Sequence, residues 1–149
     1  MIKLSARPIA VPPATALGAG LLALRVVVGV TFLLHGLDKL GDLASTERFF
    51  ASLDIPAPGV MAPFVAATET VGGALLVVGL ATPLVGAVLA VNMVVALLTA
   101  KLGHGFFASD GGYELELLLI AACLAIALAG AGRFSIDAAL GDQPRREPS

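Results

Sequence analysis

The sequence predicts an all-α integral membrane protein, built as a bundle of four membrane-spanning helices. Of its 149 residues, 58% are hydrophobic and only 13% are charged, whereas soluble domains average about 45–50% and about 25%. A small soluble domain exposes too much surface to be covered by so few polar side chains. Four apolar stretches approach the roughly 20 residues that cross a bilayer. Helices suit them because each helix satisfies its own backbone hydrogen bonds in lipid.

The first apolar stretch covers residues 17–37. It follows residues 1–16, a tail with two basic residues and three prolines that we expect on the cytoplasmic side. The apolar region of a signal peptide is shorter and leads into a small-residue cleavage site. This stretch leads instead into Asp38 and Lys39, so we expect a retained membrane-spanning helix.

Typical helix breaks separate the other three predicted spans. Proline and glycine precede the second span, Ala81-Thr82-Pro83 divides the second from the third, and a glycine-rich segment precedes the fourth. The breaks place these spans at about 60–80, 84–102 and 113–130. Residues 17–140 therefore form one predicted helical domain, and residues 141–149 a flexible C-terminal tail.

The distribution of basic residues predicts the orientation of the helices. Five Lys and Arg residues flank the spans on the side of the two termini, and three lie on the opposite side. Because positive charges favour the cytoplasm, we predict a multi-pass protein of the inner membrane with both termini inside (N-in/C-in). In the first outer loop, Thr46–Leu53 mixes charges with phenylalanines, which is typical of a helix lying along the membrane surface.

Three polar side chains lie deep within the predicted spans, one on each of three helices, where a charge costs about 2.5–3.5 kcal/mol. They are Arg25, Glu69 and Asn92. Counting about 1.5 Å per residue from the inner boundary places all three roughly 12–16 Å deep. We therefore predict an ion pair between Arg25 and Glu69, completed by a hydrogen bond from Asn92. Such a pair could form a functional site or only lock the helix packing.

A second group of polar residues gathers at the outer ends of the spans. His35 could titrate near neutral pH or serve as a hydrogen-bonded end group, and Lys101 is expected to reach the membrane surface. Glu114 and Glu116 lie about 200° apart on a helix, so at most one can face the interior. On the first span, Arg25, Phe32 and Lys39 share a face that should point into the bundle. The candidate polar interior comprises Arg25, Glu69, Asn92, His35, Lys39 and Glu114.

Other functional classes find little support in the sequence. The formal net charge is only −2 and the basic residues form no stripe, so nucleic acid is not an expected partner. The single cysteine, Cys123, lies in an apolar run and belongs to no CxxC or Cys/His cluster. We expect a buried structural cysteine and no metal site.

Several segments together resemble the DoxX family of small bacterial membrane proteins. They are Leu24–Leu40, Ile55–Ala62, Glu69–Gly73, Gly105–Phe107, Gly112–Glu114 and Gly130–Asp137. The resemblance covers residues 21–140 and implies a four-helix membrane bundle, with Arg25, His35, Lys39, Glu69 and Glu114 at the polar motif positions of the family. Glu116 stands where an apolar residue is expected. Members of the family are associated with quinol oxidase and thiosulfate:quinone oxidoreductase subunits and with complexes that handle oxidative or thiol stress.

These observations favour an accessory subunit of a membrane redox complex, quinone- or thiol-linked. Its polar interior would hold a quinone head group or organise contact with a redox-enzyme subunit. No haem, flavin or metal motif is evident in the sequence, so an independent oxidase is not expected. One alternative is a channel or transporter for a small solute or protons, which would need a homo-oligomer because four helices make a narrow bundle. Another is a non-catalytic scaffold whose small residues Gly72, Gly73, Gly86 and Ala90 serve helix association.

Overall fold

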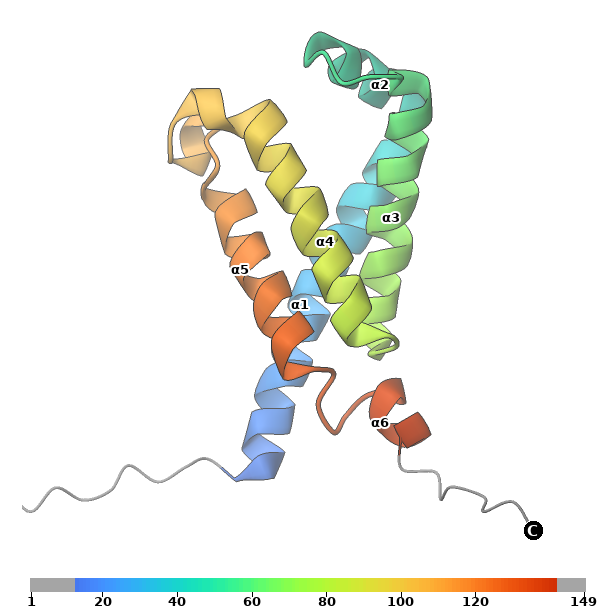
Figure 1. Ribbon diagram of the computed structural model, residues 1–149, viewed down its shortest axis with the longest axis vertical. Helices are drawn as coiled ribbons and strands as arrows, with labels where there is room; N and C mark the ends of the chain where they lie inside the picture. The colour runs from blue at the N-terminus through green and yellow to red at the C-terminus, as the bar shows by residue number, and fades with distance from the viewer. Residues whose placement is uncertain (1–12, 142–149) are drawn as a thin grey trace, which may run out of the picture.

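The computed structural model describes residues 13–141, and these residues form helices and no strand (Figure 1). This confirms the all-α prediction for the described range; residues 1–12 and 142–149 of the predicted tails lie outside it. Between α4 and α5 lie a π-helical turn (Leu97–Lys101) and two 3₁₀ turns (Leu102–His104 and Ala108–Asp110). The α-helices are α1 (Ala14–Gly41), α2 (Leu43–Ser52), α3 (Pro58–Val78), α4 (Thr82–Ala96), α5 (Glu114–Ala129) and α6 (Ile136–Gly141).

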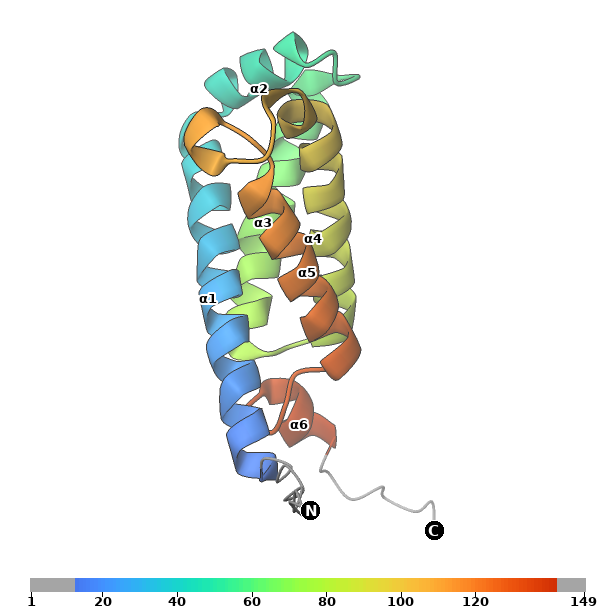
Figure 2. The ribbon, with the colours of Figure 1, turned by 90° about the vertical axis from the view of Figure 1, so that its left-hand side faces the viewer.

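The long helices pack as two antiparallel pairs, α1 with α3 and α4 with α5. In Figure 1 the two pairs converge toward the end that carries α6 and diverge toward the end that carries α2. The view turned by 90° shows the four helices running along the length of the molecule, with α2 across one end and α6 at the other (Figure 2). The two ends of the molecule therefore differ. We call the end with α2, where the helix pairs diverge, the open end.

Three helical segments are long and apolar enough to cross a membrane: α1, α3, and Thr82–His104, which joins α4 to the turns after it. They confirm the membrane prediction and coincide with three of the predicted spans. α1 begins three residues before the predicted start of the first span. α5 is apolar but has only 16 residues, so its role as a fourth span stays a prediction. Large apolar side chains on the outer surface, such as Leu128 at 88% exposure, suit a lipid environment.

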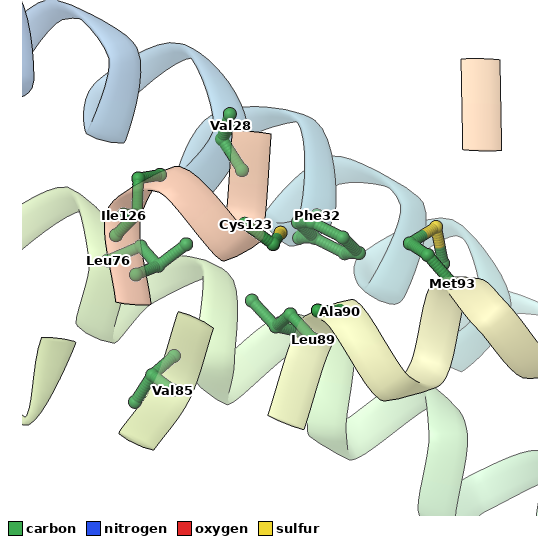
Figure 3. Close-up of a cluster of buried hydrophobic side chains, with 9 residues drawn as sticks. All are labelled: Val28, Phe32, Leu76, Val85, Leu89, Ala90, Met93, Cys123 and Ile126. Carbon is green, nitrogen blue, oxygen red and sulfur yellow. The ribbon is translucent and has the colours of Figure 1, made fainter. Parts of the chain in front are cut away.

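A buried apolar core lies where α1, α3, α4 and α5 meet (Figure 3). Cys123 is wholly buried and lies beside Phe32, consistent with the structural cysteine expected from the sequence. Phe32 occupies the α1 face that was predicted to point inward. The cluster comprises Val28, Phe32, Leu76, Val85, Leu89, Ala90, Met93, Cys123 and Ile126.

Glycines let the backbones of neighbouring helices touch. A methyl group added at Gly29 of α1 would lie 2.7 Å from the carbonyl oxygen of Gly73 in α3. One added at Gly86 of α4 would lie 2.9 Å from the carbonyl oxygen of Cys123 in α5. Such close approach is how helices associate in lipid. The small residues predicted to serve helix association therefore pack helices within this chain.

Candidate functional site

A buried carboxylate joins three helices near the open end of the molecule. Glu69 of α3 is only 3% exposed. Its Oε2 accepts a 2.5 Å hydrogen bond from Nζ of Lys39 on α1, and its Oε1 accepts a 3.0 Å hydrogen bond from Nδ2 of Asn92 on α4. Both carboxylate oxygens thus have a partner, as a buried charge requires.

The predicted Arg25–Glu69 pair is wrong, whereas the predicted hydrogen bond between Asn92 and Glu69 is confirmed. Glycine contacts explain the difference because they set the register of α1 on α3. Gly36 lies against Ala66 and Thr70, which brings Lys39 to Glu69. Arg25 is 14 residues earlier on α1, about 21 Å along the helix axis, and lies beside Gly79 at the end of α3.

Arg25 instead ties α1 to the segment that follows α5. Its side chain is 1% exposed, and its two terminal nitrogens donate hydrogen bonds to Ala131 O at 2.6 Å and Phe134 O at 2.7 Å. Ala131 lies two residues beyond the C-terminus of α5, where carbonyl groups attract a cation. The structure therefore favours the packing interpretation of Arg25 and removes it from the polar interior.

The same segment caps the start of α4. Asp137 accepts hydrogen bonds from the backbone N–H groups of Ala81 (2.7 Å) and Thr82 (2.9 Å), which have no capping side chain of their own. Desolvation raises the pKa of Asp137, but the hydrogen bonds from Thr82 and Ala81 and the charge of Arg25 outweigh it, so the pKa lies below its ordinary value. We call the segment 130–141, with its bonds to α1 and α4, the C-terminal clasp.

The clasp should weaken in acid. Because the pKa of Asp137 is lower in the folded protein, its contribution is complete above the unfolded value of about 3.9 and is lost as pH falls through the folded value. Replacing Asp137 with alanine should cost about 0.5–2 kcal/mol and reduce the loss of stability below about pH 4. Thermal unfolding in detergent from pH 3 to 7 measures both effects. An unchanged acid response in Asp137→Ala would show that other carboxylates cause it.

A cavity of about 240 Å³ opens beside the Glu69 cluster, between the two helix pairs and under α2. Lys39 and Asn92 line it, so two of the three members of the cluster face this space. Phe50 of α2, 7% exposed, covers part of it. Most of the remaining wall is apolar. The divergence of the helix pairs and the placement of α2 therefore create a partly enclosed, mainly apolar space with polar groups on its wall.

A second ion pair lines the same cavity. Lys101, in the π-helical turn after α4, lies 4.0 Å from Oε1 of Glu116 on α5. The other oxygen of Glu116 is buried and has no hydrogen-bond partner within the described part of the chain. π-helical turns often occur at functional sites, and this one carries Lys101. The cavity thus has two lysines on separate walls, Lys39 and Lys101, and each is paired with a glutamate.

The structure changes the predicted membership of the site. His35 is exposed on α1, because the face next to it, with Phe32 and Gly36, packs inward. Glu114 accepts a hydrogen bond from the Ala108 N–H at 3.0 Å and so orders the preceding loop. Both residues were predicted in the polar interior, and both lie outside the cavity. Sequence reasoning missed Glu116 and Lys101, although the 200° separation of the two acids indicated that only one could face inward.

A family comparison covers most of these residues. The model of the DoxX family matches residues 20–102, more than half of the chain. The chain belongs to the DoxX family. The match includes Lys39, Glu69, Asn92 and Lys101, whereas Glu116 lies beyond it.

Two curated proteins are similar to this DoxX-family protein over most of both chains. "Putative oxidoreductase CatD" of Bacillus subtilis (strain 168) is 37% identical over 118 residues, covering 79% of this chain and 84% of the relative. "Inner membrane protein YqjF" of Escherichia coli (strain K12) is 29% identical over 121 residues, covering 79% of this chain and 89% of the relative. No solved structure gives a significant match.

Proposed function

We propose that this DoxX-family protein is an accessory subunit of a membrane redox complex and that its cavity holds the head group of a quinone. The observation that carries the proposal is the presence of two lysines, each paired with a glutamate, on the walls of one mainly apolar cavity. The name of the relative CatD, a putative oxidoreductase, supports a redox role.

The cavity fits a small ring. Its volume of about 240 Å³ is below the roughly 300–1,000 Å³ of pockets for drug-sized ligands, so a single-ring head group suits it better than a haem or a dinucleotide. Apolar walls accommodate the ring, and the Lys39 and Lys101 ammonium groups can each donate a hydrogen bond to a carbonyl oxygen. Charge-assisted bonds of this kind are stronger than bonds between neutral groups.

The polar residues would orient the ring and supply protons. A bound quinone provides two-electron chemistry in which each oxygen also takes up a proton. Glu69 of α3 binds the Lys39 ammonium, and Asn92 of α4 binds Glu69. The Lys39 ammonium is therefore held in place by a chain of contacts that includes two other helices. Glu116 keeps an unpartnered oxygen beside Lys101 and can exchange a proton there. The electrons would come from a partner subunit.

The proposal includes an N-in/C-in arrangement in the inner membrane, with α5 as the fourth span. The start of α1 and helix α6 lie at the same end of the molecule (Figure 2), as two termini on one side of a membrane require. The relative YqjF is an inner membrane protein by name. The 16 residues of α5 reach about 24 Å, which crosses most of the hydrocarbon core. In this arrangement the cavity and α2 face the outer surface.

Binding of a tailless quinone tests the site. We expect 2,3-dimethoxy-5-methyl-1,4-benzoquinone to bind the purified protein saturably in equilibrium dialysis. The variants Lys39→Met/Glu69→Gln and Lys101→Met/Glu116→Gln should each weaken binding about tenfold, because each removes one charge-assisted hydrogen bond. Each double variant removes a whole pair and so leaves no buried charge without its partner.

The matched control is His35→Gln, at an exposed position on α1 outside the cavity, which should bind as the wild type does. Absence of saturable binding to the wild type, or wild-type affinity in both double variants, would contradict the proposed site. Native mass spectrometry of the complex from its own membranes tests the accessory role. A redox-enzyme subunit should accompany the protein, and its absence would contradict that role.

A further inference from the structure

A second hollow adjoins the proposed quinone site on the outside of the molecule. It is a groove of about 410 Å³ between α3 and α4. Phe64 of α3 is 62% exposed and Val91 of α4 is 64% exposed, so these groove residues face outward, toward lipid in a membrane. The lining is almost entirely apolar; the hydroxyl of Thr68 donates to Phe64 O in its own helix.

The groove and the cavity share part of their walls. Met61 and Val65 of α3 and Asn92 and Val95 of α4 line both spaces. Asn92 is also the residue that donates to Glu69. A single layer of side chains therefore separates the polar end of the site from the lipid-facing groove, at the open end where the helix pairs diverge (Figure 1).

We propose that the groove between α3 and α4 is the entrance for the quinone from the bilayer and the place where its hydrocarbon tail lies. This inference rests on the proposed function, since it takes the cavity as the head-group site. The polar cavity matches the ring and its oxygens, and the apolar groove matches a chain that must stay in contact with lipid. A ligand with both parts can enter sideways without passing through water.

The flexible side chain of Met61 suits an entrance of this kind. Met61 is partly buried and lines both spaces. Its unbranched thioether changes rotamer readily and adapts to ligands of irregular shape. Val65 and Val95 frame the same wall, but their branched side chains are stiffer. Movement of Met61 is therefore the simplest way to join groove and cavity.

The experiment compares two probes in lipid nanodiscs: the tailless ring used above and the same ring with a decyl chain. Wild type should bind the decyl probe at least about tenfold more tightly than the tailless one, after correction for partition into lipid. Val91→Trp fills the groove without touching the cavity, because Val91 lines only the groove. It should weaken binding of the decyl probe about tenfold and leave binding of the tailless probe unchanged.

Val27→Trp is the matched control. Val27 of α1 is 65% exposed, as Val91 is 64% exposed, but lines neither space, so both probes should bind this variant as they bind wild type. Equal affinity of wild type for the two probes, or undiminished binding of the decyl probe to Val91→Trp, would overturn the groove assignment while leaving the head-group site intact. If neither probe binds wild type, the proposed function fails and the groove assignment fails with it.

A photoreactive group at the end of the decyl chain gives a readout that does not depend on affinity. Adducts should map to the groove faces of α3 and α4, within 61–68 and 87–95. Adducts confined to α1 or α5 would overturn the proposal.

Discussion

Replacing Arg25 with methionine should destabilise the folded protein by about 3 kcal/mol or more. Methionine fills much of the same space but cannot donate hydrogen bonds, so Ala131 O and Phe134 O lose a charged donor at 2.6 and 2.7 Å. A hydrogen bond to a charged group contributes about 1.5–3 kcal/mol, and a buried acceptor left without a partner costs about 1–3 kcal/mol. The expected effect is a loss of stability with little direct effect on the cavity at the opposite end of the molecule, the proposed quinone site.

Unfolding in detergent, followed by circular dichroism against temperature or denaturant, measures this loss. Arg133→Met is the control, because Arg133 belongs to the clasp segment but is exposed, and its replacement should change stability by less than about 0.5 kcal/mol. Equal unfolding midpoints for Arg25→Met and wild type would mean that the clasp does not stabilise the helices.

Breaking the pair between Lys39 and Glu69 from one side should cost about 3–5 kcal/mol. Lys39→Met leaves the charge of Glu69, 3% exposed, with only Asn92 as a partner. Lys39→Met/Glu69→Gln removes that charge and keeps an acceptor for Asn92. The double variant should therefore be more stable than Lys39→Met alone, by about 1–3 kcal/mol, although it carries one more substitution.

A double-mutant cycle of unfolding free energies measures this coupling. Lys101→Met provides the comparison, because the pair of Lys101 with Glu116 is wider, at 4.0 Å, and its lysine is 35% exposed. Breaking this pair should lower the free energy of unfolding by about 1 kcal/mol or less. Additive effects of Lys39→Met and Glu69→Gln would contradict a coupled buried pair.

Much of the fold follows from patterns that a single sequence displays. The length of the apolar stretches and the proline and glycine breaks predicted the three candidate spans to within a few residues. The shared face of Arg25 and Phe32 at helical spacing predicted which side of α1 is buried. These patterns depend on local geometry and on transfer to lipid, which act on each helix by itself.

Partners between helices could be predicted only in part. Counting depth from a membrane boundary gave the correct partner for Asn92 but not for Arg25, because the real register depends on where Gly29 and Gly36 seat against α3. α1 also begins at Ala14, three residues before the boundary from which depth was counted. The register of two packed helices depends on how their two surfaces fit together. A single sequence shows the residues of each helix but not how the two helices meet.

The positions of side chains at the ends of helices were harder to predict than the partners between helices. Glu114 is the first residue of α5, and its hydrogen bond to Ala108 comes from the path of the preceding loop. Lys101 reaches the cavity from a π-helical turn. No residue pattern in the sequence predicted this turn. In both cases an irregular backbone determines where the side chain lies, and helical periodicity carries no information about it.

The clasp also sets the order in which the protein can be completed during synthesis. Arg25 and its acceptors are 106 and 109 residues apart, and ribosomes add about 5–20 residues per second. At that rate, roughly 5–20 s pass between synthesis of Arg25 and synthesis of Ala131. During this interval α1 carries an unsatisfied cation, and the nascent chain must hold it near water or other polar groups. The charge on α1 thus gains its buried partners only after more than 100 further residues have been made.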